Sequence, residues 1–265
     1  MRASLSKEGR SAMLQAVIFD VDGTLADTER DGHRPAFNAA FRESGLDWEW
    51  DTRLYGELLA VTGGKKRIRH YIERYHPAFM DRPDLDDLIA GVHRAKTRHY
   101  GALLRDGGIP PRPGVVRLIR ELASKGKRLA IATTTTPENV TTLLATTLNA
   151  LPPESFEIIG AGDIVAAKKP APDIYAWVLE RMQLPASACL AIEDSRNGLL
   201  AAHRAGLPVV VTQSAYTADE DFDGSAAVLS DLGEPDAPFT VHQGDSEGHR
   251  WATVGLLERW HGAST

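Results

Sequence analysis

The sequence predicts an α/β protein: a doubly wound parallel-sheet (Rossmann-like) core with an α-helical cap domain inserted after the first strand. From residue 115 onward, apolar strand-like runs alternate with helical patterns, as in a sheet covered by helices on both faces. Residues 30–104 show helical spacing only, and a single strand-like run precedes them. The helical block is therefore an insertion, and an insertion at this point of the chain can act as a lid.

The first strand carries the most informative segment, AVIFDVDGTL at residues 16–25. Ala16 to Phe19 is a continuous apolar run, typical of a strand buried on both faces, and Gly23 marks its end. Asp20 and Asp22 then emerge at the carboxyl edge, where open α/β sheets bind ligands. Residues i and i+2 of a strand point to the same side, so both carboxylates face one small space. Two hard oxygen ligands without a nearby His or Cys favour Mg²⁺.

The cap is predicted as residues 29–106 and the core as residues 13–28 and 107–265. Helical periods in the cap are given by Ala36, Phe37, Ala40 and Phe41, by Ile68, Tyr71, Ile72 and Tyr75, and by Leu85, Leu88, Ile89 and Val92. Pro35 interrupts the first cap helix, and Trp48 and Trp50 are expected to pack the cap core. The Gly/Pro-rich stretch 107–114 then returns the chain to the sheet.

The core elements follow in order. Helices are predicted at 115–125, 137–149, 172–183 and 197–205, and strands at 128–133, 156–160, 188–193 and 208–212. Residues 236–250 are rich in Gly, Asp and His and are predicted as a loop, followed by an amphipathic helix in WATVGLLERWHG.

Composition narrows the class of protein. The chain has 265 residues, a net charge of −6 and one cysteine. An acidic balance does not favour nucleic acid or anionic membrane as a partner, and no obligate protein partner is evident. Cys189 excludes an internal disulfide and is expected to be a buried small hydrophobe, which fits a cytoplasmic location. No apolar stretch reaches the length of a membrane span, and residues 1–12 are expected to be a disordered leader.

Three further strand ends carry reactive side chains. Thr133 and Thr134 precede a helix that opens around Pro137, a suitable place for a phosphoryl oxygen, although Thr is also an ordinary strand residue. Lys168 and Lys169 stand before two prolines, and a lysine at the sheet edge can neutralise a phosphoryl group. Glu193, Asp194 and Ser195 end the apolar strand LAIEDS, so a second carboxylate pair is available for a cation, and a helix N-cap is compatible with it.

In this order, D-x-D-G-T, the strand-end Thr, K-P-A-P-D and E-D-S resemble the haloacid dehalogenase-like hydrolases over residues 14–230. The resemblance implies that Asp20 is a nucleophile that forms an aspartyl-phosphate and that Asp22 is the general acid/base. Asp22, in place of the Tyr of true dehalogenases, indicates phosphoryl transfer. It further implies that Thr133 binds phosphate, that Lys169 stabilises charge, and that a Mg²⁺ cofactor is held by Asp20, Asp22, Glu193 and Asp194.

The helical cap resembles the β-phosphoglucomutase-like subgroup, and the phrases DTERDGHRPAFN, LDWEW and TGGKKRI resemble the CbbY group within it. That group is encoded with Rubisco and Calvin-cycle enzymes and is associated with hydrolysis of xylulose 1,5-bisphosphate. Phosphate- or sugar-binding residues are therefore expected in the cap, and Thr134 is expected to contribute from the core. The expected cap residues are Glu29, His33, Gly63, Gly64, Lys65 and Arg67.

The physics of the cap supports an anionic substrate. The Gly-Gly pair places flexible N–H groups and a helix N-terminus beside cations. Helix geometry puts Lys65 and Arg69 on one face and Lys66 on another, where it is expected to be solvated. Glu29 and His33 could instead be plain helix surface.

Two rivals remain at this stage. A phosphoglucomutase shares the chemistry, and the sequence does not separate it from a sugar-phosphate phosphatase. A receiver-type signalling domain also uses an Asp cluster, a Thr and a Lys, but it is much shorter and lacks the helical insertion.

Overall fold

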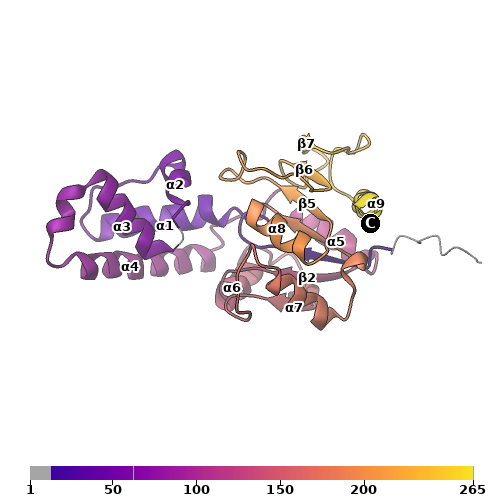
Figure 1. Cartoon of the computed structure of the whole chain (residues 1–265), viewed down its shortest axis with the longest axis horizontal. Coiled ribbons are helices and arrows are strands. Elements are labelled where there is room, and N and C mark those ends of the chain that lie inside the picture. The colour runs from indigo at the N-terminus through magenta and orange to yellow at the C-terminus, as the bar shows by residue number, and fades with distance from the viewer. Residues whose placement is uncertain (1–12, 62, 265) are drawn as a thin grey trace, which may run out of the picture. The chain divides into compact units, whose positions relative to one another are not determined.

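The computed structural model describes residues 13–61 and 63–264, and the chain forms two compact units (Figure 1). The predicted leader, residues 1–12, and Thr62 of the TGGKKR phrase lie outside the described residues. The core unit runs to Leu25 and continues through Arg112–Thr136 and from Leu151 onward. The helical unit comprises Ala26–Pro111 and Pro137–Ala150. Residues 137–150 thus group with the helical unit, and the domain boundaries drawn from the sequence stay a prediction.

The core unit is built on a mostly parallel sheet, which confirms the predicted fold class. In the described residues the strand order is β3-β2-β1-β4-β5-β6-β7, and every neighbouring pair is parallel except β6 and β7. The strands are β1 (Ala16–Phe19), β2 (Arg128–Ala132), β3 (Ile158–Gly160), β4 (Cys189–Glu193), β5 (Val209–Thr212), β6 (Ala227–Leu229) and β7 (Val241–Gln243). Phe19 is in register with Ile131 on β2 and Ile192 on β4, so these three strands end side by side.

Helices cover the sheet as the alternating pattern predicted (Figure 1). The helices of this unit are α5 (Val115–Ser124), α7 (Asp173–Met182), α8 (Arg196–Arg204) and α9 (Val254–Ser264), with short 3₁₀ turns at Pro153–Ser155 and Ala186–Ala188. Helices α7 and α8 contact each other, and so do α5 and α9. Ala16, Ile18 and the buried Cys189 pack with the residues of α7 and α8, so the apolar strand residues form the core as expected.

The C-terminal part differs from the prediction. Residues 236–250 were expected to be a loop, but Val241–Gln243 pairs antiparallel with β6, and β6 was not predicted either. Both strands are three residues long, and β7 is half-buried to exposed, so neither has an apolar period long enough to recognise. Among the described residues, no helix has both the length and the apolar character needed to cross a membrane.

The helical unit is formed around aromatic side chains. Its helices are α1 (Arg34–Glu43), α2 (Thr52–Leu58), α3 (Gly64–Tyr75), α4 (Leu85–Arg105) and α6 (Pro137–Thr146), with a π-helical turn at Thr28–His33 and a 3₁₀ turn at Pro77–Asp81. Trp48 and Trp50 are 4% and 0% exposed and pack against Phe41, which confirms their predicted role in the cap core. Pro35 lies in the first turn of α1, where no N–H is needed, and the turn before it is π-helical.

Candidate active site

Three carboxylates meet at the carboxyl edge of the sheet in the core unit. Asp20 follows β1, Glu193 ends β4 and Asp194 follows it. Since β1 and β4 are parallel neighbours, their ends bring these residues together. One oxygen of each lies within 4.8 Å of the others, and the residues are 7%, 0% and 7% exposed. We call Asp20, Glu193 and Asp194 the carboxylate group.

Lys169 joins this group as a buried cation. Its Nζ donates to Asp20 Oδ1 at 2.6 Å, to Glu193 Oε1 at 2.6 Å and to the Ala132 carbonyl oxygen at 2.8 Å. Burial alone would lower the pKa of Lys169, but Asp20 and Glu193 raise it above its ordinary value, so the side chain stays charged. Lys168, its neighbour in the sequence, is half exposed and pairs with Asp163 at the surface.

Glu193 has a second partner, which was not predicted from the sequence. The Tyr175 hydroxyl donates to Glu193 Oε1 at 2.5 Å, and Tyr175 is fully buried. The available signal was the aromatic residue two positions after the K-P-A-P-D motif, to which no role was given. Burial raises the pKa of Glu193 to about 7, against the lowering effect of Lys169. Among the described residues, Glu193 Oε2 has no hydrogen-bond partner.

Asp194 lies against the turn that follows β1. Gly23 has φ +85°, and a Cβ placed on it would come within 2.1 Å of Asp194 Oδ2, so no other residue fits here. Burial raises the pKa of Asp194 well above its ordinary value, and the charges of Asp20 and Glu193 raise it further. Ser214 donates a hydrogen bond to the carboxylate, which acts in the opposite direction.

The carboxylate group fits a hard divalent cation. Three buried acids face one lysine, and an oxygen of Glu193 lacks a partner among the described residues. Burial, and then the charges of Asp20 and Glu193, raise the pKa of Asp194. Mg²⁺, which prefers such oxygen ligands, would relieve the repulsion among the three carboxylates. Bound divalent cations commonly neutralise clusters of buried acids in this way. The residues present therefore fit the predicted Mg²⁺ cofactor.

The remaining predicted core residues follow the carboxyl ends of β1 and β2. Asp22 is half-buried in the turn after Asp20, and its carboxylate is not among the three that gather for a cation. Thr133 follows β2, is 1% exposed, and its Oγ1 accepts from the Thr135 N–H at 3.3 Å. Thr134 is exposed directly after it.

The helical unit holds a second group of ionisable side chains. The Tyr55 hydroxyl donates to Glu29 Oε2 at 2.6 Å, Arg67 Nη1 donates to the Tyr55 oxygen at 3.1 Å, and Lys96 Nζ contacts His33 Nδ1 at 2.7 Å. We call Glu29, His33, Tyr55, Arg67 and Lys96 the polar cluster. Tyr55 and Arg67 are buried, whereas the other three are half-buried and so reach solvent.

Electrostatics gives the polar cluster a positive balance. Burial lowers the pKa of His33 to about 3, and Lys96 and Arg67 lower it as well, so the imidazole is neutral and Nδ1 accepts from Lys96. Burial alone would raise the pKa of Glu29, but the hydrogen bond from the Tyr55 hydroxyl and the charges of Arg67 and Lys96 hold it below its ordinary value. Two cations therefore face one carboxylate, which favours an anionic ligand.

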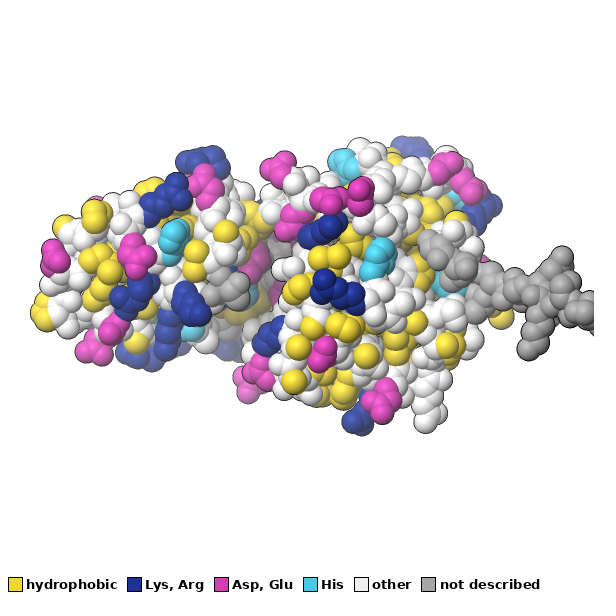
Figure 2. Space-filling model, in the orientation of Figure 1, with side chains coloured by type: hydrophobic (Ala, Val, Ile, Leu, Met, Phe, Trp, Pro, Cys, Tyr) yellow, Lys and Arg dark blue, Asp and Glu magenta, His cyan; other side chains and the backbone are white. Residues whose placement is uncertain are grey.

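The structure separates the cations that follow Gly63 and Gly64 in the sequence. Arg67 belongs to the polar cluster, whereas Lys65, Lys66 and Arg69 line a surface depression of about 280 Å³ with Asp86. Figure 2 shows Lys and Arg side chains gathered on one face of this unit. Lys66 thus shares its depression with Lys65 and Arg69, although the helix period separates them, because these side chains are long. Gly63 (φ +97°) precedes α3, and a Cβ on Gly64 would come within 2.7 Å of His93.

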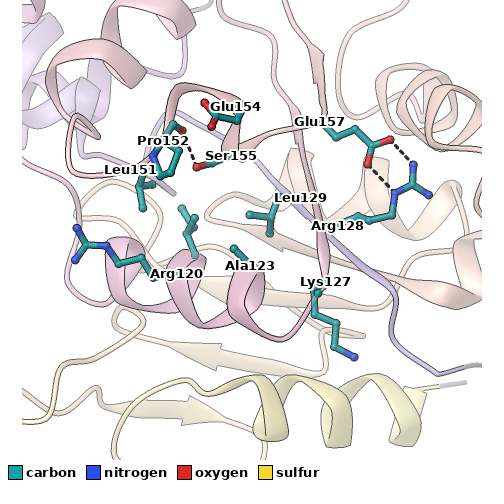
Figure 3. A pocket seen from close by; sticks show the side chains of 12 residues that line it. Arg120, Ala123, Lys127, Arg128, Leu129, Leu151, Pro152, Glu154, Ser155 and Glu157 are labelled. Carbon is teal, nitrogen blue, oxygen red and sulfur yellow. Dashed lines mark hydrogen bonds and ion pairs between the residues drawn. The ribbon is translucent and has the colours of Figure 1, made fainter.

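A larger cavity of about 490 Å³ lies elsewhere in the core unit (Figure 3). It is lined by Ala123 of α5 and by Leu129, Leu151 and Glu157 near the starts of β2 and β3. Reactive side chains follow the carboxyl ends of the strands, so this cavity is at the wrong end of the sheet for the reaction. Two of the cations that line it are already paired, Arg128 with Glu157 and Lys127 with Glu258.

Comparison with known proteins gives a family and close relatives. Residues 14–206 match the model of the haloacid dehalogenase-like hydrolases. The chain is 50% identical to a plasmid-encoded CbbY protein of Cupriavidus necator, over 94% of this chain and 97% of the relative.

Two solved structures are also similar to the chain. An Asp-to-Asn variant of CbbY from Rhodobacter sphaeroides, in complex with xylulose-1,5-bisphosphate, is 45% identical with a TM-score of 0.69, covering 84% of this chain and 96% of that one. A putative β-phosphoglucomutase from Thermotoga maritima is 26% identical with a TM-score of 0.63, covering 81% and 94%.

Proposed function

Because the chain belongs to the haloacid dehalogenase-like hydrolases and is a phosphatase, we propose that it removes one phosphate from a sugar bisphosphate through an aspartyl-phosphate on Asp20. One observation carries the proposal. Asp20 lies in the carboxylate group with its Oδ1 held at 2.6 Å by the buried Lys169. A nucleophile fixed by a cation at a strand end is what covalent phosphoryl transfer needs.

The reaction we propose has two displacements. The Asp20 carboxylate forms a bond to phosphorus while the bond to the sugar oxygen breaks, and Asp22 gives a proton to that oxygen. Asp22 then takes a proton from water, whose oxygen attacks phosphorus and releases inorganic phosphate and free Asp20. Lys169 and the Thr133 hydroxyl neutralise and hold the phosphoryl oxygens, whose charge spreads during transfer. Thr134 is a further phosphate-binding residue in this proposal.

Mg²⁺ is the cofactor that we propose. Asp20, Glu193 and Asp194 would hold it, and Asp22, two residues after Asp20, is proposed to contribute as well. When bound, the ion would neutralise negative charge on the phosphoryl group. Glu193 Oε1 is already engaged by Lys169 and Tyr175, and Glu193 Oε2 is packed against Gly198 of α8, where a Cβ would come within 1.9 Å of it.

Xylulose 1,5-bisphosphate is the substrate that we propose, since a CbbY structure at 45% identity contains it. The positive balance of the polar cluster suits the phosphate that does not react, with Arg67 as the buried guanidinium available for it. Glu29 and His33 are proposed to bind sugar hydroxyls, and Gly63, Gly64 and Lys65 to add anion-binding N–H groups and charge. By resemblance to the CbbY group, the reaction would remove an inhibitor of Rubisco, in the cytoplasm.

A substrate panel tests the proposal. Sugar mono- and bisphosphates are incubated with the protein and Mg²⁺, and inorganic phosphate and sugar products are quantified. We expect one phosphate released per xylulose 1,5-bisphosphate, with xylulose 5-phosphate as the product. Preference for another phosphorylated metabolite would contradict the substrate assignment and leave the reaction class intact.

A mutase is the second candidate function, because the Thermotoga maritima structure described as a putative β-phosphoglucomutase is similar to the chain. A mutase would return the phosphoryl group to another hydroxyl of the sugar. The same panel separates the two, since a mutase converts a sugar phosphate into its isomer without stoichiometric release of phosphate.

A further inference from the structure

Arg112 is a buried arginine of the core unit whose donors converge on loop carbonyls around the carboxylate group. It is 7% exposed and is the first core-unit residue after the helical insertion. Its backbone N–H donates to the Leu25 carbonyl at 2.9 Å. In the sequence this residue stands within the Gly/Pro-rich stretch 107–114, and no role was predicted for its side chain.

The guanidinium of Arg112 binds four residues from three separate parts of the chain. Nη1 donates to the Gly23 carbonyl and, at 2.9 Å, to the Thr212 carbonyl. Nη2 donates to the carbonyls of Gln213 at 2.5 Å and Ser230 at 2.6 Å. A planar fork with several N–H donors can hold such a set of acceptors at once, whereas a lysine ammonium cannot match their directions.

Two of these contacts lead directly to the reactive carboxylates. Gly23 lies in the turn that begins with Asp20 and Asp22, and it is pressed against Asp194. The Thr212 hydroxyl accepts from Arg112 at 3.3 Å and donates to the Glu193 carbonyl at 3.5 Å. The same guanidinium therefore connects the turn after β1 with the end of β4, the two segments that carry the carboxylate group.

We propose that Arg112 is a positioning residue for hydrolysis: it clamps the Gly23 turn onto the ends of β4 and β5, so that Asp20 and Asp22 keep their alignment with the phosphoryl group. Arg112 touches no reacting atom in this role. A displacement of the nucleophile by about 1 Å can cost about 100-fold in rate, so a loosened turn should slow the chemical step rather than weaken binding.

Arg117 provides a matched control in the same unit. It also binds backbone carbonyls through its guanidinium, those of Ala252 at 2.7 Å, Leu232 at 3.1 Å and Gly233 at 2.9 Å. These partners lie in the C-terminal part of the core unit, after β6, as Ser230 does. None of them is in the turns that carry the carboxylate group, so loss of the Arg117 fork should destabilise the fold without disturbing the nucleophile.

The experiment compares Arg112→Lys with Arg117→Lys in the full chain with Mg²⁺. The unfolding temperature of each variant is measured first. Then kcat and KM are measured on an activated aryl phosphate and on xylulose 1,5-bisphosphate, well below that temperature. We expect Arg112→Lys to lower kcat by about 10- to 100-fold with KM changed by less than about threefold. Arg117→Lys should keep kcat within about twofold of wild type, even if its unfolding temperature falls as much as that of Arg112→Lys.

A kcat for Arg112→Lys within about twofold of wild type, or an equal loss of kcat in Arg117→Lys, would overturn the proposal. If Arg112→Lys does not fold, Thr212→Val decides, because it removes one hydroxyl at nearly constant shape. We expect it to lower kcat about 3- to 10-fold at an unchanged unfolding temperature, and an unchanged kcat would overturn the proposal.

The inference rests on the proposed reaction but not on the proposed substrate. If wild type hydrolyses only the aryl phosphate, the substrate assignment fails while the comparison of Arg112 with Arg117 can still be made.

Discussion

The carboxylate group of the core unit and the polar cluster of the helical unit both bury ionisable side chains, but with opposite charge balance. In the carboxylate group, three acids share one buried cation, Lys169, which pairs with Asp20 and Glu193, and two of the acids have raised pKa values. In the polar cluster, Arg67 and Lys96 outnumber Glu29, and His33 stays neutral. A site short of positive charge suits a cation cofactor, and a site with excess positive charge suits an anionic part of the substrate.

We propose that the carboxylate group carries out the chemistry and that the polar cluster recognises the substrate. Substitutions in the carboxylate group should then affect every substrate, whereas substitutions in the polar cluster should affect only substrates with a second phosphate.

Replacing the nucleophile should have the largest effect. Asp20→Asn keeps the shape of the side chain but removes its ability to attack phosphorus, so we expect kcat to fall by at least about 10³-fold for all substrates. Steady-state phosphate release measures it, and an unchanged unfolding temperature provides the control for folding. Activity within about tenfold of wild type would contradict the assignment of Asp20 as the nucleophile.

Metal removal should be nearly as severe and reversible. EDTA should stop turnover and Mg²⁺ should restore it. Mg²⁺ at 100 times its Kd should raise the free energy of unfolding by about 2.7 kcal/mol. Calorimetry with and without the ion measures this gain, and Asp194→Asn should lose most of it. Full activity in the metal-stripped protein would contradict the assignment of the carboxylate group as a cation site.

These two predictions concern the part of the site that could be predicted from the sequence. Asp20, Lys169 and Asp194 follow strands that are visible as apolar runs, and parallel strands place their ends at one edge. The apolar pattern of the strands was therefore enough to predict that these three side chains lie close together.

The polar cluster could be predicted only in part. Glu29, His33 and Arg67 were expected there, but Tyr55 and Lys96 were not, since their contacts span 26 and 63 residues between helices. Helix packing decides which polar residues face each other, and periodicity does not reveal it. The strands β6 and β7 were missed because three residues carry no measurable alternation.

The smallest expected effect is a pH dependence of stability caused by His33. Its pKa falls from 6.5 in the unfolded chain to about 3 in the fold. Below pH 6.5 the unfolded state binds a proton that the folded state does not, so this stabilisation is complete above pH 6.5 and is lost as the pH falls toward 3.

We expect wild type to lose about 1–2 kcal/mol relative to His33→Asn between pH 7 and pH 5. Urea unfolding of both proteins at the two pH values measures it. Their difference cancels the contribution of Glu193 and Asp194, whose raised pKa values act in the opposite direction. Parallel stability curves would show that His33 is not held neutral.

The division between chemistry and recognition is tested most directly by one set of kcat/KM values. Xylulose 1,5-bisphosphate and a sugar monophosphate are compared in wild type, Arg67→Gln and Lys169→Gln. Lys66→Ala is the surface control, because Lys66 is an exposed cation of the same helix to which no role is assigned. Arg67→Gln should lose about 1.5–3 kcal/mol of transition-state stabilisation for the bisphosphate and almost none for the monophosphate, as a charge-assisted hydrogen bond requires. Lys169→Gln should lose equally for both substrates. Equal losses in Arg67→Gln for the two substrates would contradict the account, because the polar cluster would then support the fold rather than bind the second phosphate.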